Sequence, residues 1–189
     1  VPARPINTVH VLSPIRQLAK NIFCVGENYS EHIEEFHKEK LKELPKFPQF
    51  FTKAPTCVIG PDDDIDPHKN VTKELDYEGE LAVIIGKEGA DIPVSEAMNY
   101  VYGFTIMNDV TARDLQRNHG QWFHGKSLDT FAPLGPCILL RDAAPDAFTI
   151  VRMRRQKNSF SPFRRLFLRS PRARHSNLAI SFLQARRPA

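Results

Sequence analysis

The sequence predicts an α+β fold that is mostly β. Much of residues 1–150 divides into short apolar or alternating runs that are typical of strands, while residues 29–44 place their apolar side chains at helical spacing. The hydrophobic fraction of 41% is ordinary for a globular protein and allows one domain with a packed core. No apolar run approaches the roughly 20 residues that span a bilayer, so we expect no membrane partner.

The expected elements can be placed along the chain in order. The helix over 29–44 begins after Asn28, a residue type suited to capping it, and ends before Pro45 and Pro48. A short helix is expected over 111–118. The remaining elements are strands, bounded by turn residues or prolines, and they are expected over 22–25, 50–53, 57–59, 74–85, 102–108 and 136–140.

Cys24, Cys57 and Cys137 are odd in number, lie far apart and sit in apolar strand-like runs. Such a pattern indicates neither a disulfide framework nor a zinc site. We interpret all three as reduced core residues, which are usual in the cytosol. A cytoplasmic location is therefore expected.

Two glutamates in the expected strand 74–85 are the first candidates for chemistry. Alternating residues of a strand share a face, so Glu78 and Glu80 would lie about 7 Å apart and repel each other unless a cation or proton intervenes. Asp109 ends the next apolar run. Three oxygen ligands on strands suit a hard divalent cation such as Mg²⁺ or Mn²⁺. The alternative is a solvated face of a half-buried sheet.

His32 and Glu35 lie three residues apart on the expected helix and are therefore side-chain neighbours. A carboxylate beside an imidazole orients one ring nitrogen and makes the other more basic, as in catalytic triads. A surface ion pair on a charged helix is the alternative interpretation.

The chain resembles the fumarylacetoacetate hydrolase family over residues 10–150. The resemblance rests on several segments that occur in the order and at the spacing of that family. They are Ile22 to His32, Phe51 to Pro55 with Ile59 to Pro61, Asp76 to Gly86, Gly103 to Gln116, and Gly125 to Pro136.

The resemblance implies a mixed β-roll like the C-terminal domain of that family, incomplete here at its C-terminus. It also implies a site built from eight residues. Mg²⁺, Mn²⁺ or Ca²⁺ would be held by Glu78, Glu80 and Asp109; His32, Glu35 and Lys126 would be catalytic; Gln116 and Lys53 would bind substrate.

The implied function is that of a metal-dependent hydrolase, lyase or isomerase acting on a small 2-oxo or enol carboxylic acid. Acylpyruvate, oxaloacetate or a related intermediate of aromatic catabolism would react through a metal-stabilised enolate, by cleavage of a C–C bond, decarboxylation or enol–keto isomerisation. A homodimer is expected. The alternatives are an inactive truncated relative and a protein that binds nucleic acid through its tail.

The charge of the chain is divided unevenly. Residues 1–150 carry 15 basic and 22 acidic residues, whereas residues 151–189 carry ten Arg, one Lys and no acidic residue. Three parts are therefore expected: a lead-in over 1–20, an incomplete catalytic domain over 21–150 and a disordered basic tail over 151–189. A frameshift near Met153 explains the tail most simply; a real extension that binds nucleic acid or anionic lipid is the alternative. Any ordered part of the tail would be a helix around 178–183.

Overall fold

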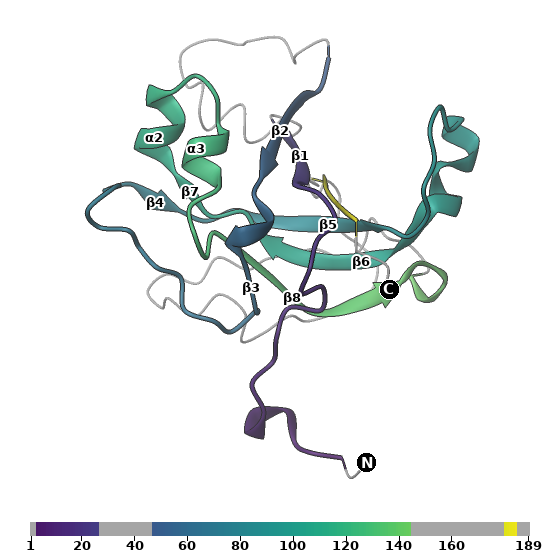
Figure 1. The fold of residues 1–189 in the computed structure, drawn as a ribbon. Coiled ribbons are helices and arrows are strands. Elements are labelled where there is room, and N and C mark those ends of the chain that lie inside the picture. Colours follow the sequence, from purple (N-terminus) through teal and green to yellow (C-terminus); the bar gives the residue numbers. More distant parts are fainter. Residues whose placement is uncertain (1–2, 27–46, 145–179, 185–189) are drawn as a thin grey trace, which may run out of the picture.

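The computed structural model describes residues 3–26, 47–144 and 180–184, and these residues are mostly β, as predicted. A 7-stranded sheet has the order β2-β1-β9-β5-β6-β8-β3 (Figure 1). Its strands are β1 (Ile22–Gly26), β2 (Gln49–Lys53), β3 (Val58–Ile59), β5 (Gly79–Ile85), β6 (Val101–Asn108), β8 (Ala132–Leu140) and β9 (Ile180–Gln184). A 2-stranded sheet joins β4 (Leu75–Asp76) to β7 (Thr111–Ala112).

The described residues also form short helices. They are the α-helices α2 (Arg113–Asn118) and α3 (Phe123–Lys126) and the 3₁₀-helices η1 (Ile6–Thr8), η2 (Pro55–Cys57), η3 (Val94–Tyr100) and η4 (Arg141–Ala143). No helix in the described ranges is both long and apolar enough to cross a membrane. The helix predicted over 29–44 lies outside the described residues.

Strand β5 lies near the centre of the sheet and has apolar side chains on both faces. Ala82 and Ile84 belong to the larger core cluster, whereas Leu81 and Val83 belong to a second cluster on the opposite face. Because both faces are buried, the apolar residues of this strand are continuous instead of alternating. The larger cluster also includes residues from β1, β6 and β8, among them Ile22, Cys24, Met107, Ala132 and Leu134.

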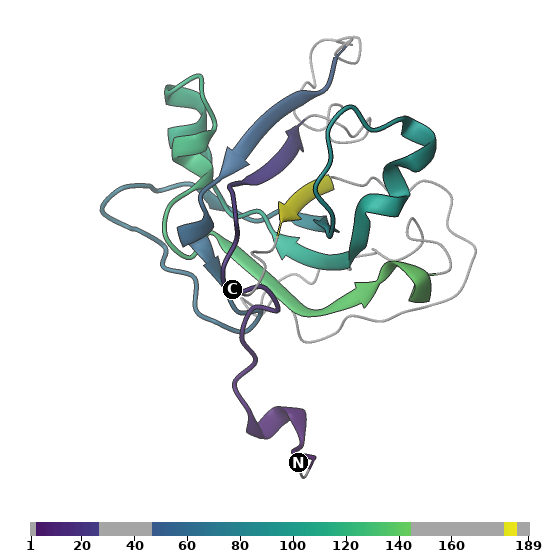
Figure 2. The same ribbon diagram turned by 45° about the vertical axis from the view of Figure 1, so that its right-hand side comes forward.

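The two ends of the sheet differ in what surrounds them. Helices α2 and α3 and the β4–β7 pair gather at the end where β5 begins and β6 ends, and η3 and η4 lie at the other end (Figure 1). Figure 2 shows the same separation after rotation, with η1 extending away from the sheet. The strand register agrees, because Gly79 pairs with Asn108 at the first end. The predicted acidic residues therefore lie at the end of the sheet that carries α2 and α3, which we call the helical end.

The strand predicted over 74–85 is divided in the structure. Residues 75–76 pair with β7, whereas residues 79–85 pair with β6 and β9. The chain changes from one sheet to the other at Tyr77 and Glu78, so Glu78 lies just before β5 and not inside a continuous strand. The helix predicted over 111–118 is likewise divided, because residues 111–112 form the short strand β7 and α2 begins only at Arg113.

The prediction of a helix around residues 178–183 was wrong. Residues 180–184 form β9, which pairs parallel with β5 and antiparallel with β1. A strand between two neighbours satisfies its backbone groups on both sides, whereas an isolated helix this short is unstable in water. The rest of 151–189 lies outside the described residues, so the proposed division of the chain there stays a prediction.

The cysteine prediction is confirmed at two positions and wrong at the third. Cys24 and Cys57 are buried, reduced cysteines, and Cys137 is reduced but exposed. Burial raises the pKa of Cys57 to about 11, so this thiol is protonated and unreactive at neutral pH.

Candidate functional site

The backbone at the helical end of the sheet holds two of the predicted acids side by side. The Asp109 N–H donates to the Glu78 carbonyl at 2.7 Å. The Glu78 N–H in turn donates to Asn108 Oδ1 at 3.2 Å. Glu80 lies two residues further along, inside β5, with an exposed fraction of only 7%. The structure therefore places these three acids at the same end of the sheet, close enough to influence one another electrostatically, and their role as ligands of one cation stays a prediction.

Lys126 lies between two of these carboxylates. Its Nζ donates to Glu78 Oε2 at 2.7 Å and to Asp109 Oδ2 at 2.9 Å, and it lies 4.9 Å from the centre of the Phe51 ring. Burial lowers the pKa of Lys126, but Asp109 and Glu78 outweigh burial and raise this pKa above its ordinary value. Lys126 is therefore a buried ammonium whose charge these two carboxylates stabilise.

Close packing fixes the helix that carries Lys126. Trp122, which precedes α3, packs edge-on against Phe51 at 5.3 Å between ring centres. A Cβ added to Gly26 would lie 2.4 Å from the Trp122 ring, so only glycine fits at the end of β1. Gly125 is equally confined, since an added Cβ would lie 2.7 Å from the Gln116 backbone nitrogen. Small residues therefore let β1 and α2 approach α3.

Lys53, at the end of β2, has no exposed surface. Its Nζ donates to Asp109 Oδ1 at 2.6 Å, so Asp109 accepts from two ammonium groups, one on each oxygen. Burial raises the pKa of Asp109, but Lys126 and Lys53 outweigh burial and hold this pKa below its ordinary value. Burial of Lys53 favours a role inside the protein over the predicted contact with substrate.

Arg113 belongs to the same network, although sequence reasoning missed it. Its guanidinium contacts Glu78 Oε1 at 2.6 Å and Asp76 Oδ2 at 2.8 Å. It also donates to Gln116 Oε1 at 3.0 Å. The available signal was its position between Asp109 and Gln116 in a segment that resembles the family. Arg113 joins the acids to the residue predicted to bind substrate.

Glu80 has the least favourable environment among the acids. Its Oε2 is buried and has no hydrogen-bond partner in the described part of the chain. Burial, followed by the nearby charges of Asp109 and Glu78, raises the pKa of Glu80 well above its ordinary value. A cation beside this oxygen would offset both causes.

Replacing Glu80 with Gln should stabilise the metal-free protein increasingly as pH rises. A raised folded-state pKa means that the folded protein binds more protons than the unfolded chain, so Glu80 lowers stability above its unfolded pKa of about 4.3. Glu80→Gln should therefore exceed the wild type by at least about 1 kcal/mol at pH 8, with a smaller difference at pH 5.

Urea unfolding in the presence of EDTA measures this difference. Glu74→Gln is the matched control, because Glu74 is half-exposed and pairs only with the exposed Arg117 in the described residues. Equal stability differences at pH 5 and pH 8 for Glu80→Gln would contradict the assigned environment.

The donor set fits a divalent cation, although no ready-made cluster of three His, Cys, Asp or Glu ligands exists among the described residues. In this structure Lys126 bridges Glu78 and Asp109. With Glu80 protonated, three carboxylates (Asp76, Glu78 and Asp109) balance three cations (Lys53, Arg113 and Lys126). Ionised Glu80 leaves one negative charge in excess, which a metal ion can neutralise.

The remaining predicted residues are placed only in part. Gln116 lies on α2, partly buried and held by Arg113. His32 and Glu35 lie in 27–46, outside the described residues. Gly26, which immediately precedes that segment, contacts Trp122 beside Lys126.

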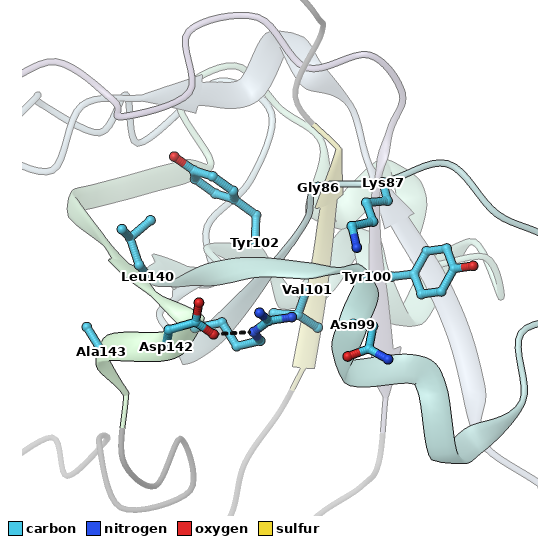
Figure 3. Close-up of a pocket in the computed structure, with 10 residues that line it drawn as sticks. Gly86, Lys87, Asn99, Tyr100, Val101, Tyr102, Leu140, Asp142 and Ala143 are labelled. Atoms are coloured by element: carbon cyan, nitrogen blue, oxygen red, sulfur yellow. Dashed lines mark hydrogen bonds and ion pairs between the residues drawn. The ribbon is translucent and has the colours of Figure 1, made fainter.

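A hollow of about 520 Å³ lies at the other end of the sheet. Figure 3 shows its lining, which includes the Arg141–Asp142 ion pair at 2.7 Å. Tyr102, Leu140 and Lys87 also line it. It contains none of the predicted site residues, so the candidate site is defined by the buried charges and not by this hollow.

The family model and the related sequences that match this chain agree with one another. The model of the fumarylacetoacetate (FAA) hydrolase C-terminal domain matches residues 21–161. Oxaloacetate tautomerase YisK of Bacillus subtilis is 48% identical over 134 residues, which are 71% of this chain and 44% of that protein. Mitochondrial oxaloacetate tautomerase FAHD2A of Homo sapiens is 41% identical over 148 residues, 77% of this chain and 45% of that protein.

Solved structures agree with this likeness. A fumarylacetoacetate hydrolase from Exiguobacterium antarcticum matches with a TM-score of 0.61 and 48% identity, over 72% of this chain and 48% of that one. A 2-hydroxyhepta-2,4-diene-1,7-dioate isomerase from Mycobacterium marinum matches with a TM-score of 0.60 and 37% identity, over 72% of this chain and 48% of that one. The chain spans about half the length of these relatives. It belongs to the fumarylacetoacetate hydrolase family.

Proposed function

We propose that this chain is a divalent-cation-dependent enzyme that isomerises the enol and keto forms of a small 2-oxo dicarboxylic acid of the oxaloacetate type. The observation that supports this most is the buried oxygen of Glu80, which lies near Asp109 and Glu78 and has no hydrogen-bond partner among the residues that the structure describes. An acidic cluster with one uncompensated charge, next to a buried ammonium, suits a cation and an anionic substrate together.

The predicted cation site consists of Glu78, Glu80 and Asp109. Mg²⁺ is the predicted ion, with Mn²⁺ or Ca²⁺ as substitutes, because all three ligands are carboxylates. When bound, such an ion would make the carbon acid of a chelated 2-oxo acid easier to deprotonate.

The protein residues supply the remaining chemistry. Lys126 donates to the two carboxylates from a buried position and would stabilise the oxygen on which negative charge develops. Arg113 orients Gln116 through its 3.0 Å hydrogen bond, which supports a contact of Gln116 with the substrate. His32, oriented by Glu35, is proposed as the general base that moves the proton at the carbon atom.

Isomerisation is favoured over the other reactions by the relatives. Two of them are named oxaloacetate tautomerases, and one solved structure is named as a dienedioate isomerase. Hydrolysis of an acylpyruvate and decarboxylation of oxaloacetate pass through a related enolate, so product analysis has to distinguish the three.

The test is a spectrophotometric assay of enol-oxaloacetate conversion with Mg²⁺ or Mn²⁺ present. We expect ketonisation above the uncatalysed rate, its loss in EDTA, and no production of pyruvate. His32→Ala should lower turnover by about two to four orders of magnitude. His10→Ala is the matched control, since His10 is an exposed histidine paired with Asp63. Pyruvate as the main product would show that the reaction is decarboxylation and not isomerisation.

An inactive member of the family is the second candidate. Folded, metal-binding protein without turnover of oxaloacetate or acylpyruvate would support this second candidate.

The predicted homodimer is part of the main proposal. Sedimentation analysis of the chain in solution tests this oligomeric state.

A further inference from the structure

Lys53 uses its whole hydrogen-bonding capacity inside the protein. A lysine ammonium has three N–H donors and no acceptor. The Lys53 Nζ contacts Asp109 Oδ1 at 2.6 Å, the Val110 carbonyl at 3.1 Å, and the Lys126 carbonyl. Its side chain has an exposed fraction of 0%. Lys53 therefore has neither a free donor nor surface with which to contact a substrate.

The acceptors of Lys53 belong to separate parts of the candidate site. Asp109 and Val110 follow β6, whereas Lys126 is the last residue of α3. They are separated from Lys53 by 56, 57 and 73 positions in the sequence. One ammonium group at the end of β2 thus joins the end of β6 to the end of α3.

This arrangement fixes two site residues relative to each other. Lys53 holds one oxygen of Asp109, and the Lys126 ammonium holds the other at 2.9 Å. Because Lys53 also contacts the Lys126 carbonyl, the backbone that carries this second ammonium is held by the same group. A rotation of the Asp109 carboxylate or a displacement of α3 would break at least one of these bonds.

We propose that Lys53 is a positioning residue that holds the Asp109 carboxylate and Lys126 as one preorganised unit. This inference rests on the proposed function for the roles of Asp109 as a metal ligand and of Lys126 as a donor to substrate. Lys53 itself touches neither the substrate nor the metal. Replacing a group that orients a metal ligand in this way typically lowers metal affinity by about 10–100-fold.

Metal affinity distinguishes positioning from a simple effect of charge. Lys53→Met removes a positive charge beside Asp109, so electrostatics alone predicts tighter binding of Mn²⁺. Lys53→Arg keeps the charge, but its planar guanidinium cannot direct donors to the same three acceptors. If Lys53 positions the site, both variants should bind Mn²⁺ about 10–100-fold more weakly than the wild type.

The experiment is a calorimetric titration of the full, EDTA-treated chain with Mn²⁺. Circular dichroism and urea unfolding identify the variants that remain folded. Lys87→Met is the matched control, because Lys87 is an exposed lysine at the opposite end of the sheet (Figure 3). Weaker binding by the folded variants, with the control unchanged, is the expected result. Wild-type or tighter binding by folded Lys53→Met and Lys53→Arg would overturn the inference.

A measurement on the wild type covers the case in which neither variant folds. Nuclear magnetic resonance of ¹⁵N-lysine should show an ammonium that is protected from exchange and stays protected when Mg²⁺ and oxalate, a small dicarboxylate probe, are added together. Absence of any ammonium that stays protected would overturn the positioning role.

The outcome is separable from that of the proposed function. Metal binding without turnover would contradict the proposed enzyme activity and leave the Mn²⁺ comparison valid. Turnover that persists in folded Lys53 variants with unchanged Mn²⁺ affinity would contradict only the positioning role.

Discussion

Replacing Asp109 with Asn should destabilise the metal-free protein by about 3–5 kcal/mol, the usual cost of removing one partner of a buried ion pair. Asp109 accepts from Lys53 at 2.6 Å and from Lys126 at 2.9 Å, and both lysines are buried. An amide of the same shape would turn an N–H donor toward one of these ammonium groups and leave its charge uncompensated.

Urea unfolding with EDTA at pH 7 measures this loss. Asp142→Asn is the control, since Asp142 forms an ion pair with Arg141 while its side chain is 83% exposed. Exposed pairs contribute about 0–1 kcal/mol, so the control should change little. A similarly small effect of Asp109→Asn would contradict the buried network.

Replacing Lys126 with Met should separate catalysis from metal binding. The variant retains all three predicted ligands and loses the ammonium that bridges Glu78 and Asp109. Removal of a donor that stabilises developing charge typically lowers kcat by about 10²–10³-fold. Mn²⁺ affinity should change much less than kcat, because Lys53 still holds the Asp109 carboxylate.

Steady-state ketonisation of oxaloacetate and Mn²⁺ titration of the same sample give both quantities. Lys87→Met serves again as the control for a lysine outside the site. Unchanged kcat in the Lys126 variant would assign the stabilisation of charge to another group, with Arg113 the first candidate.

Only part of the acidic cluster could be predicted from strand patterns, because Glu80 lies inside β5 and Asp109 directly follows β6, whereas Glu78 lies outside both strands. Strand β6 was predicted to within one residue, since an apolar run that ends at Asn108 is typical of a strand. The position of Asp109 after it followed directly. The break at Tyr77 could not be predicted, because it depends on β4 pairing with β7, a contact between distant segments.

The roles of the cationic residues required the structure. A lysine in a strand is usually exposed, and no pattern in the sequence shows that Lys53 is completely buried among three acceptors. Arg113 is bound to acids 35 and 37 positions away, a separation that carries no periodic signal. The pairing of His32 with Glu35 depends only on helical spacing and stays a prediction.

The most direct test is whether the folded, metal-free chain binds Mn²⁺ at Glu78, Glu80 and Asp109. Isothermal titration of the wild type, Glu80→Gln and Asp109→Asn provides the measurement, with circular dichroism to confirm folding. We expect one saturable site per chain in the wild type, weaker binding in Glu80→Gln and none in Asp109→Asn. No saturable binding by the folded wild type, or equal binding by all three proteins, would contradict this expectation.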